Sequence, residues 1–292
     1  MHTPKLLRRP PHEYASTLLE VTKGCAYNQC LFCSLYQDVR FEPVALEDIE
    51  EDLDEIADTE RNLRRVLLIG GNPMGLPNSR LVPVLKTIRA KLPTVSQVGG
   101  YIRTADIKAK SDADLAEMVA LGVTDVAIGT ECAWDPALVR MHKGHTAADI
   151  LEQYARLETA GIGYSLFYLG GFAGAGSCVE SARASAEVFN QLHPKRITIM
   201  TMTPYPGCRL RGQIEDETFQ LAPESEVMAD VAAFIDGLTC KTLIAGSHDS
   251  NFFRIDGILP RDRERMVATL ERRRRQIDDK AAGAVRMKML SM

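Results

Sequence analysis

Long apolar stretches are absent from this chain of 292 residues. No run reaches the roughly 18 apolar residues that a membrane-spanning helix requires. Residues 1–14 are polar and contain prolines, so they also lack the apolar core of a secretory signal peptide. We therefore expect a cytoplasmic protein that has no membrane partner.

An excess of positive charge is also lacking, since 35 Lys and Arg residues face 39 Asp and Glu residues and the formal net charge is −4. This balance disfavours a general nucleic-acid-binding protein, although it leaves room for a small basic patch. One such patch is the four-arginine run at residues 272–275. Runs of like charge on a terminal helix usually form a solvated face, so nucleic acid is not the expected partner.

The chain has no stretch rich in proline, glycine or serine that would mark a linker, and no motif repeats at a fixed offset. With 45% hydrophobic residues it can bury a sizeable core, and its length suits a single domain of α/β-barrel size. We expect an N-terminal extension over residues 1–16, a barrel core over residues 17–240, and a C-terminal extension over residues 241–292 that carries a charged helix.

Apolar runs of strand length alternate with segments of helical periodicity along the chain. Strands are predicted at residues 18–21, 66–69, 95–102, 123–128, 164–169 and 197–202. Helices are predicted at residues 45–61 and 79–91, from starts near residues 111, 146 and 223, and over the charged segment 260–278. This alternation, with strands about 30 residues apart, predicts an α/β fold of parallel strands, curled into a full or partial (β/α)6-type barrel. Its chemistry would lie at the carboxyl ends of the strands.

Seven cysteines are present, an odd number that disfavours a disulfide framework in a reducing compartment. Three of them, Cys25, Cys30 and Cys33, have the spacing C-x4-C-x2-C shortly after the first predicted strand. Three thiolates this close can ligate three irons of a [4Fe–4S] cluster and leave the fourth iron open, whereas a structural zinc site normally has four protein ligands. A zinc loop completed by a distant ligand, or three buried cysteines without a metal, are the alternatives. The other four are scattered along the chain: Cys132, Cys178, Cys208 and Cys240.

Four motifs lie just beyond predicted strands: the cysteine segment, Gly70-Gly71-Asn72, Ile128-Gly129-Thr130-Glu131 and Leu169-Gly170-Gly171-Phe172-Ala173-Gly174. Together they resemble the radical S-adenosylmethionine (SAM) superfamily, in particular the branch around oxygen-independent coproporphyrinogen III oxidase. The resemblance extends over residues 18–260. Two departures accompany it. The superfamily typically has one residue fewer between its first two cysteines, and it often has glutamate where this chain has Asn72.

The resemblance implies that the three cysteines hold the [4Fe–4S] cluster. It further implies that SAM is bound through its amino group by the turn after the second strand, through its ribose by a carboxylate, and through its adenine by a glycine-bearing backbone. The residues in these positions are Phe32 beside the cysteines, then Gly70, Gly71 and Asn72, then Glu131, and finally Leu169 and Gly170. Lys143, in a following turn, is as well explained by surface exposure or loop packing as by ligand binding.

The implied activity is that of an enzyme. An electron donor such as flavodoxin or ferredoxin would reduce the cluster, SAM would be cleaved to methionine and a 5′-deoxyadenosyl radical, and that radical would remove hydrogen from an unidentified small-molecule substrate. An oxidoreductase, a lyase and a methyltransferase would all carry the same SAM apparatus. Two alternatives stay open: an enzyme that modifies transfer RNA or other RNA, and a non-catalytic iron–sulfur or zinc-binding protein.

Residues at predicted strand ends and beyond are candidates for acting on the substrate. An arginine there could bind a carboxylate or phosphate through two hydrogen bonds, and a cysteine thiol could donate a hydrogen atom. Each position also has an ordinary structural explanation, because such tyrosines pack at core edges, arginines are usually solvated and free cysteines are often small buried hydrophobes. The candidates are Tyr101, Arg103, Tyr168, Tyr205, Arg209, Cys208 and Cys240.

Overall fold

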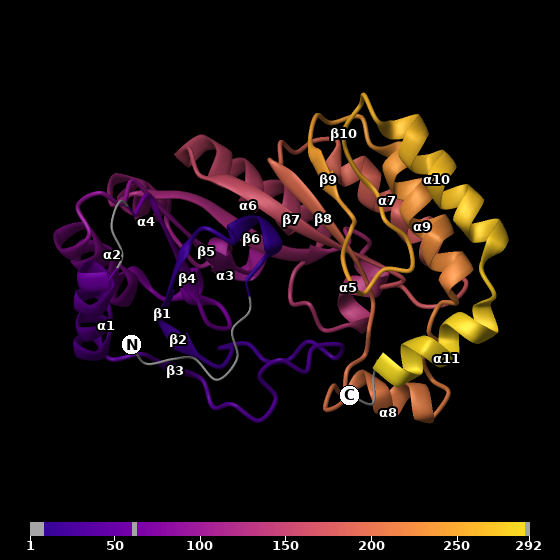
Figure 1. Cartoon of the computed structure of the whole chain (residues 1–292), viewed down its shortest axis with the longest axis horizontal. Helices are drawn as coiled ribbons and strands as arrows, with labels where there is room; N and C mark the ends of the chain where they lie inside the picture. Colours follow the sequence, from indigo (N-terminus) through magenta and orange to yellow (C-terminus); the bar gives the residue numbers. More distant parts are fainter. Residues whose placement is uncertain (1–8, 60–62, 290–292) are drawn as a thin grey trace. The chain divides into compact units, whose positions relative to one another are not determined.

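The computed structural model describes residues 9–59 and 63–289 and divides the chain into two compact units (Figure 1). The first unit is Met1–Asn28, Asp38–Ile128 and Ala155–Tyr164, and the second is Gln29–Gln37, Gly129–Tyr154 and Ser165–Met292. The chain passes between the units within β6 (Val123–Glu131), α6 (Ala147–Ala160) and β7 (Gly163–Gly170). The predicted α/β class, with mostly parallel strands, is confirmed.

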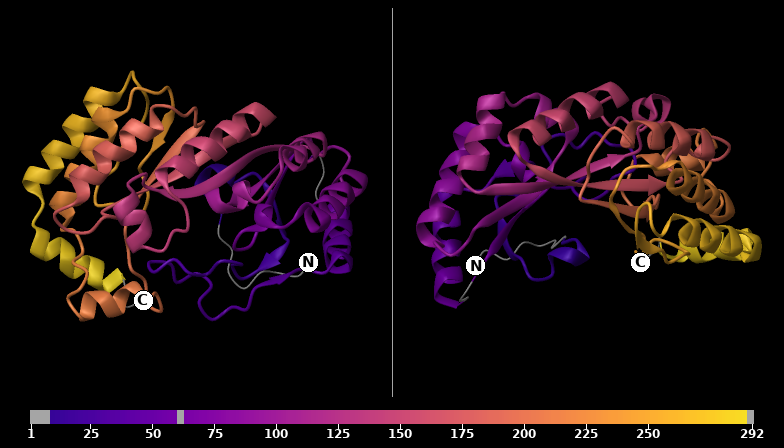
Figure 2. Two further views of the ribbon diagram at one scale, coloured as in Figure 1. Left: turned by 180° about the vertical axis from the view of Figure 1, so that it is seen from behind. Right: turned by 90° about the horizontal axis from the view of Figure 1, so that it is seen from above.

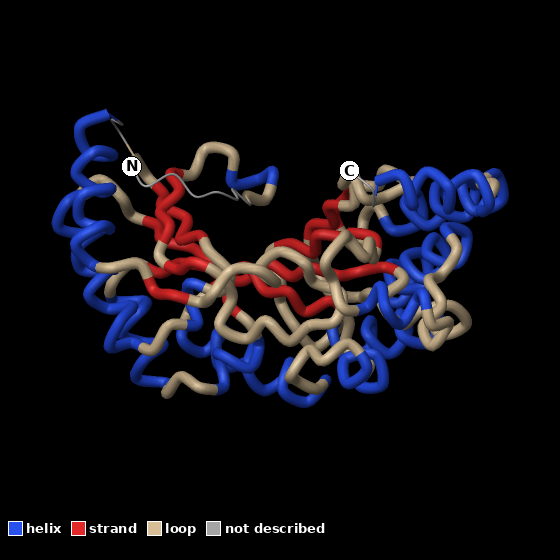
Figure 3. Tube along the Cα trace, turned by 90° about the horizontal axis from the view of Figure 1, so that it is seen from below, coloured by secondary structure: helices blue, strands red, loops and turns tan. Residues whose placement is uncertain are grey.

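The first unit contains parallel strands and the helices that connect them. In chain order, its further elements are η1 (Pro11–Glu13), β1 (Thr17–Glu20), β2 (Thr22–Lys23), β3 (Glu42–Pro43), α1 (Leu46–Thr59), β4 (Arg65–Ile69), η2 (Pro73–Gly75), α2 (Asn78–Lys91), β5 (Gln97–Ile102), α3 (Thr104–Lys108) and α4 (Asp112–Ala120). The parallel strand order is β1, β4, β5, β6, and β2 pairs with β3 in a separate antiparallel pair. Helices α1, α2 and α4 lie along one side of these strands (Figures 1 and 3).

Local sequence explains why these elements form. β4 reads Arg-Val-Leu-Leu-Ile and is buried throughout residues 66–69, as expected of a parallel strand that is covered on both faces. α1 buries Ile49, Leu53 and Ile56, which recur at the spacing of one helix face. This face packs the helix against the strands, and Asp52 is buried beside it, whereas Glu51, Asp54 and Glu55 are exposed.

Arg65, at the start of β4, links the N-terminal segment to the strands of the first unit. Its Nε donates to Glu13 Oε2 at 2.8 Å, while its Nη2 and Nη1 donate to the two carboxylate oxygens of Asp125 at 2.6 and 3.0 Å. A Cβ on Gly99 would lie 2.5 Å from Arg65 Nη2, so a glycine is required where the guanidinium passes. Burial raises the pKa of Glu13, but hydrogen bonds from Arg65 and Ser16 outweigh burial and leave that pKa lowered.

Replacing Arg65 by methionine keeps most of the side-chain volume and removes both ion pairs. Two part-buried carboxylates then lose their counter-charge, so we expect the free energy of unfolding in urea to fall by about 3 kcal/mol near neutral pH. The lowered pKa of Glu13 stabilises the wild type above the ordinary pKa of the group, and this contribution is lost as the pH falls through the folded value. The difference in the free energy of unfolding between the wild type and Arg65→Met should therefore become smaller in acid.

The control for this experiment is Lys91→Met, which breaks an ion pair with the exposed Asp54. Exposed pairs contribute little, so the control should change the free energy of unfolding by less than about 1 kcal/mol. If Arg65→Met and Lys91→Met lowered the free energy of unfolding equally, the ion pairs of Arg65 would contribute no more than an exposed pair.

The second unit also alternates strands with helices. In chain order, its further elements are α5 (Asp135–Arg140), α7 (Cys178–Phe189), β8 (Arg196–Thr201), α8 (Leu210–Glu215), α9 (Glu224–Gly237), β9 (Leu243–Ala245), β10 (Asp256–Ile258), α10 (Arg263–Gln276) and α11 (Asp279–Met289). β7, β8 and β9 pair in parallel, and β10 joins β9 antiparallel. Helix α9 packs against both α7 and α10 (Figure 2).

All six predicted strands are present, but the short β9–β10 pair was not predicted, because strands of three residues carry little periodicity. The predicted final helix ends earlier, at α10, since Ile277 has an extended backbone, and the chain then forms α11. Residues 60–61 of the predicted first helix and residues 1–8 of the predicted N-terminal extension lie outside the described residues. The domain division at residues 16 and 240 stays a prediction.

Candidate functional site

The predicted site residues occur in both units, mostly where strands end. They follow β2, β4, β5 and β8 or lie at the last residues of β6 and β7. The first unit holds Cys25, Gly70, Gly71, Asn72, Tyr101 and Arg103, and the second holds Cys30, Phe32, Cys33, Glu131, Leu169, Gly170, Cys208 and Cys240.

In the first unit, the glycine turn after β4 packs directly against the beginning of the cysteine segment. Gly71 N donates to Gly24 O at 3.0 Å. A Cβ on Gly71 would lie 2.2 Å from Gly24 O and 2.6 Å from Cys25 Cα, and one on Gly70 would lie 2.1 Å from Thr22 O. Both glycines are therefore required for the close approach of two backbones.

Asn72, the third residue of this turn, carries a buried acceptor. Its side chain is almost wholly buried, and its Nδ2 donates to Asp106 Oδ2 at 2.5 Å. A Cβ on Gly75 would lie 2.2 Å from Asn72 Nδ2, so that glycine makes room for the amide. Within the part of the chain that the structure describes, Asn72 Oδ1 has no hydrogen-bond partner. A buried carbonyl oxygen without a partner costs free energy unless a donor, such as the ammonium group of a ligand, occupies the space beside it.

Arg103 lies on the other side of Asp106, just after β5. Its Nη1 is 3.6 Å from Asp106 Oδ1, and its guanidinium carbon lies 3.7 Å from the centroid of the Tyr27 ring. Arg103 is a candidate for substrate binding, and in this structure it contacts a tyrosine of the cysteine segment and a carboxylate of its own unit; its contact with a substrate stays a prediction. Tyr101, its neighbour in β5, is half-buried.

The second part of the cysteine segment is bound on both sides by backbone of the second unit. Leu31 N donates to Met141 O at 3.1 Å, and Leu31 O accepts from Leu210 N at 2.8 Å. Phe32 meets Phe172 edge to face, with ring centroids 5.2 Å apart and an interplanar angle of 82°. Phe172 belongs to the glycine motif after β7, so this contact joins two of the predicted motifs.

Glu131 ends β6 with a left-handed backbone, at φ +67°. Its Oε1 accepts a hydrogen bond from Lys143 Nζ at 3.0 Å, and both side chains are buried. The Lys143 ammonium also lies 5.7 Å from the Phe32 ring centroid. A Cβ on Gly129 would lie 2.6 Å from Glu131 Oε1, so glycine leaves the space for this carboxylate. Lys143 is therefore a buried partner of Glu131, which excludes surface exposure, one of the three explanations that the sequence left open for it.

Asp230, on α9, holds the glycine turn after β7 and was not predicted from sequence. Its Oδ2 accepts from Gly171 N at 2.8 Å, and its Oδ1 accepts from the Tyr168 hydroxyl. Gly171 has φ +79°, where glycine is strongly preferred. Burial raises the pKa of Asp230 to about 7, while the hydrogen bonds from Tyr168 and Gly171 act in the opposite direction.

A sequence pattern could have pointed to Asp230. Val227, Val231 and Phe234 lie on the apolar face of α9, and Asp230 is a carboxylate among them, while Glu224 is a second buried carboxylate at the start of the helix. A carboxylate on a buried helix face must have a hydrogen-bond partner, which for Asp230 comes from the end of β7. Tyr168, a candidate that core packing explained as well, is a core residue: it is 1% exposed, and its ring stacks on Phe234 with centroids 3.8 Å apart.

The remaining candidates are less closely connected to these motifs. Arg209 Nη1 donates to Gln29 Oε1 at 3.3 Å, beside the cysteine segment, and Tyr205 is 45% exposed. Burial raises the pKa of both Cys208 and Cys240, which keeps them as thiols at neutral pH.

The residues present fit the cofactors that the motifs imply in two respects. Cys25, Cys30 and Cys33 are half-buried thiols, and three thiols are the donors that an iron–sulfur cluster takes. Among residues 9–59 and 63–289, no three His, Cys, Asp or Glu side chains lie close enough to hold a metal ion. The assignment of these ligands therefore stays a prediction from their spacing. For SAM, the buried and unpartnered Asn72 Oδ1 fits an ammonium donor.

The family model of the radical SAM superfamily matches residues 19–173, which is more than half of the chain. The chain belongs to the radical SAM superfamily. Members of this superfamily bind a [4Fe–4S] cluster and SAM. The matched range of this radical SAM protein includes the cysteine segment, the turn after β4, Glu131 and the glycine motif after β7. No curated protein matches its sequence.

Solved structures of radical SAM proteins share this fold. The chain is similar to the methyltransferase TsrM from Kitasatospora setae, which was solved with cobalamin and a [4Fe–4S] cluster, with a TM-score of 0.57 and 17% identity over 69% of this chain and 39% of that chain. It is also similar to methylornithine synthase PylB (TM-score 0.54, 18% identity, 92% of this chain and 85% of that chain). A third is HydG, a maturase of the [FeFe]-hydrogenase (TM-score 0.54, 17% identity, 87% and 54%).

These likenesses concern the fold alone, because the identities are so low. The chain spans only about two fifths of the length of TsrM. Across the described residues, no helix is both long and apolar enough to cross a membrane.

The raised pKa of Asp230 predicts a pH-dependent stability. The folded protein binds a proton on Asp230 more tightly than the unfolded chain does, so this contribution is complete below the ordinary value of 3.8 and is lost as the pH rises to about 7. In Asp230→Asn the group no longer titrates. We expect the melting temperature of the wild type, relative to that of Asp230→Asn, to fall across this pH range.

The matched control is Asp236→Asn, which changes an exposed carboxylate on the same helix. It should keep the pH dependence of the wild type. Parallel pH profiles for the wild type and Asp230→Asn would show that Asp230 does not titrate in this range.

Proposed function

We propose that this protein is a radical SAM enzyme that binds a [4Fe–4S] cluster through Cys25, Cys30 and Cys33 and cleaves SAM reductively. When bound, the cluster supplies an electron to SAM, and hydrogen is then removed from a substrate. The observation that carries the proposal is the buried, unpartnered Asn72 Oδ1, because it lies at the strand end where the superfamily resemblance places the amino group of SAM.

Asn72 accepts a hydrogen bond from the SAM ammonium, and Asp106 supplies the charge that an asparagine lacks. The carboxylate of Asp106 is 2.5 Å from Asn72 Nδ2, so it polarises the amide and turns Oδ1 toward the ligand. This pair takes the place of the glutamate that the superfamily often has at position 72. A hydrogen bond to a charged group contributes about 1.5–3 kcal/mol, which makes this contact large enough to measure.

Glu131 accepts hydrogen bonds from the ribose hydroxyls through its carboxylate. Lys143 orients that carboxylate, since its buried ammonium donates a hydrogen bond to Glu131 Oε1 at 3.0 Å. The ammonium also lies near the Phe32 ring, so one lysine orients a predicted SAM ligand beside the cysteine segment.

The backbone at Leu169 and Gly170 contacts adenine. Asp230 holds the next amide, Gly171 N, and thereby determines the shape of this turn. The contact of Phe172 with Phe32 packs the turn against the segment that carries Cys30 and Cys33. Together these groups position SAM and exclude water from it, which a reactive primary radical requires.

The substrate is proposed to be a small molecule, and the electron donor a flavodoxin or ferredoxin. Arg209, Tyr101, Cys208 and Cys240 stay candidates for substrate contacts. Three further points also stay predictions. They are the location in the cytoplasm, the type of reaction (oxidoreductase, lyase or methyltransferase) and membership of the coproporphyrinogen oxidase-like branch. The alternatives are an RNA-modifying radical SAM enzyme and a protein that binds a cluster or zinc without catalysis.

The reaction is tested by anaerobic reconstitution followed by dithionite and SAM, with 5′-deoxyadenosine measured by mass spectrometry. The wild type should bind about four irons per chain and release 5′-deoxyadenosine, whereas Cys30→Ala should lose the cluster and the product. Cys178→Ala removes a buried thiol outside the motif and should retain both. A fully iron-loaded wild type that releases no 5′-deoxyadenosine would favour the non-catalytic alternative.

The role of Asn72 and Asp106 is tested by SAM binding to the reconstituted protein, measured by anaerobic equilibrium dialysis. Asn72→Ala should weaken binding by about tenfold or more, because a hydrogen bond to the ammonium is lost. Asp106→Asn keeps the shape and removes the charge, so it should weaken binding most at low ionic strength. Asp58→Asn, at an exposed position on α1, is the control. Unchanged affinity in both site variants, with normal iron content, would contradict the assignment.

A further inference from the structure

A cavity of about 490 Å³ opens in the second unit between the loop before β10 and helix α10. It lies outside the motifs discussed above, and its volume is within the range of roughly 300–1,000 Å³ that is usual for small-molecule sites. The residues that line it are Asn251, Phe252, Phe253, Arg254, Thr269, Arg272, Arg273 and Gln276.

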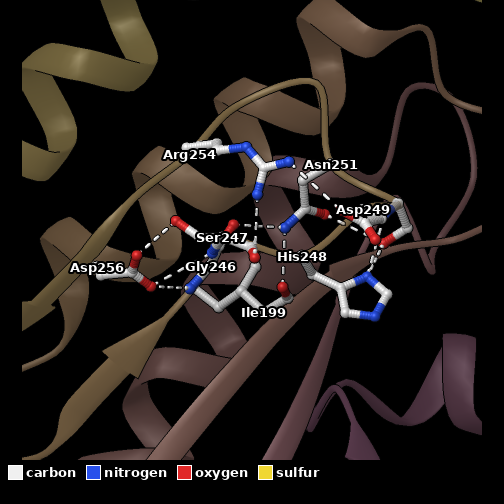
Figure 4. A network of polar contacts seen from close by, with 9 residues as sticks. Ile199, Gly246, Ser247, His248, Asp249, Asn251, Arg254 and Asp256 are labelled. Atoms are coloured by element: carbon white, nitrogen blue, oxygen red, sulfur yellow. Dashed lines mark hydrogen bonds and ion pairs between the residues drawn. The ribbon is translucent and has the colours of Figure 1, made fainter. Parts of the chain in front are cut away.

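The loop on one side of this cavity is held in place by hydrogen bonds (Figure 4). Asn251 Nδ2 donates to Ile199 O at 2.9 Å and to Gly246 O at 2.8 Å. At the far end of the loop, Asp256 accepts hydrogen bonds from Gly246 N and from the hydroxyl of Ser247. These hydrogen bonds connect the loop to β8 and to the end of β9. The backbone that carries the lining side chains is therefore fixed before a ligand binds.

The lining carries three guanidinium groups and no carboxylate. Arg254 is partly neutralised, because its Nη2 lies 3.4 Å from the carboxylate of the exposed Asp249. Within the described residues, the side chains of Arg272 and Arg273 make no hydrogen bond or ion pair. By contrast, the next residue, Arg274, is paired with Glu271. Arg272 and Arg273, which have no counter-charge among the described residues, make this lining positive in a chain of net charge −4, so the cavity attracts anions.

We propose that this cavity binds the phosphate group of a small phosphorylated ligand. Arg272 and Arg273 contact the phosphate oxygens, because the planar guanidinium matches phosphate through two parallel hydrogen bonds. The side-chain amide of Gln276 is a further donor on the same helix.

The rest of the ligand lies against Phe252. The ring of Phe252 is itself 5.0 Å from the Arg286 guanidinium, which helps to hold it in place. An aromatic wall beside a cluster of arginines suits a phosphate ester with a planar or apolar body, such as a nucleoside monophosphate. This inference stands apart from SAM cleavage, since none of the lining residues belongs to the predicted SAM site.

The probe is uridine 5′-monophosphate, titrated calorimetrically into the full chain that has been reconstituted and saturated with SAM, so that the SAM site is filled. Uridine and inorganic phosphate are titrated in parallel. We expect the monophosphate to bind and uridine to bind at least about tenfold more weakly, because the phosphate makes the charged contacts. Binding of the nucleoside with equal affinity would overturn the proposal.

The variants compare two pairs of arginines on one helix. The double variant Arg272→Gln, Arg273→Gln changes the lining, whereas Arg274→Gln, Arg275→Gln makes the same change of charge outside it. The lining pair should weaken monophosphate binding by about tenfold or more, and the outer pair by less than about threefold. If both double variants lost the same affinity for the monophosphate, the proposal would be overturned. Binding would then depend on the overall positive charge of the helix and not on the residues that line the cavity.

Two further results would also overturn it. One is the absence of binding to both the monophosphate and inorganic phosphate. The other is tight binding of a short single-stranded RNA, steeply dependent on salt, without measurable binding of the monophosphate, which would assign the arginines to an RNA backbone.

Discussion

Parallel pairing of strands decides where this chain can do chemistry, because the carboxyl ends of neighbouring parallel strands meet at one edge of a sheet. In the first unit, the turn after β4 lies close enough to the cysteine segment for Gly71 N to donate to Gly24 O. In the second unit, the turn after β7 brings Phe172 against Phe32. Motifs that are far apart in sequence thus become neighbours within each unit.

Buried or half-buried carboxylates give these strand-end loops their shape. Asp106 accepts from Asn72, Glu131 accepts from Lys143, and Asp230 accepts from Gly171 N. Each carboxylate would be costly to bury without a donor, so each contact specifies one loop conformation. The same loops carry the groups that a charged and polar cofactor needs, and rigid placement of those groups lowers the entropy lost on binding.

Much of the fold was predictable, because strand and helix periodicity is a property of neighbouring residues. The six longer strands and most helices follow from it, and the glycine turns follow from their positions at strand ends. Partners were harder to predict. The sequence left exposure, loop packing and ligand binding open for Lys143, whose ammonium lies on Glu131 in the structure, and it left both a site role and core packing open for Tyr168, which is buried.

The sequence by itself determined the family, through the cysteine spacing and the glycine-bearing motifs, and it determined the α/β class, through the alternation of apolar runs. Only the tertiary structure decided which side chains meet. Asn72 and Asp106 are 34 residues apart, and Tyr168 and Asp230 are 62 apart. Periodicity records whether a residue is buried, whereas the choice of its partner depends on how separate strands and helices pack, which no local pattern contains.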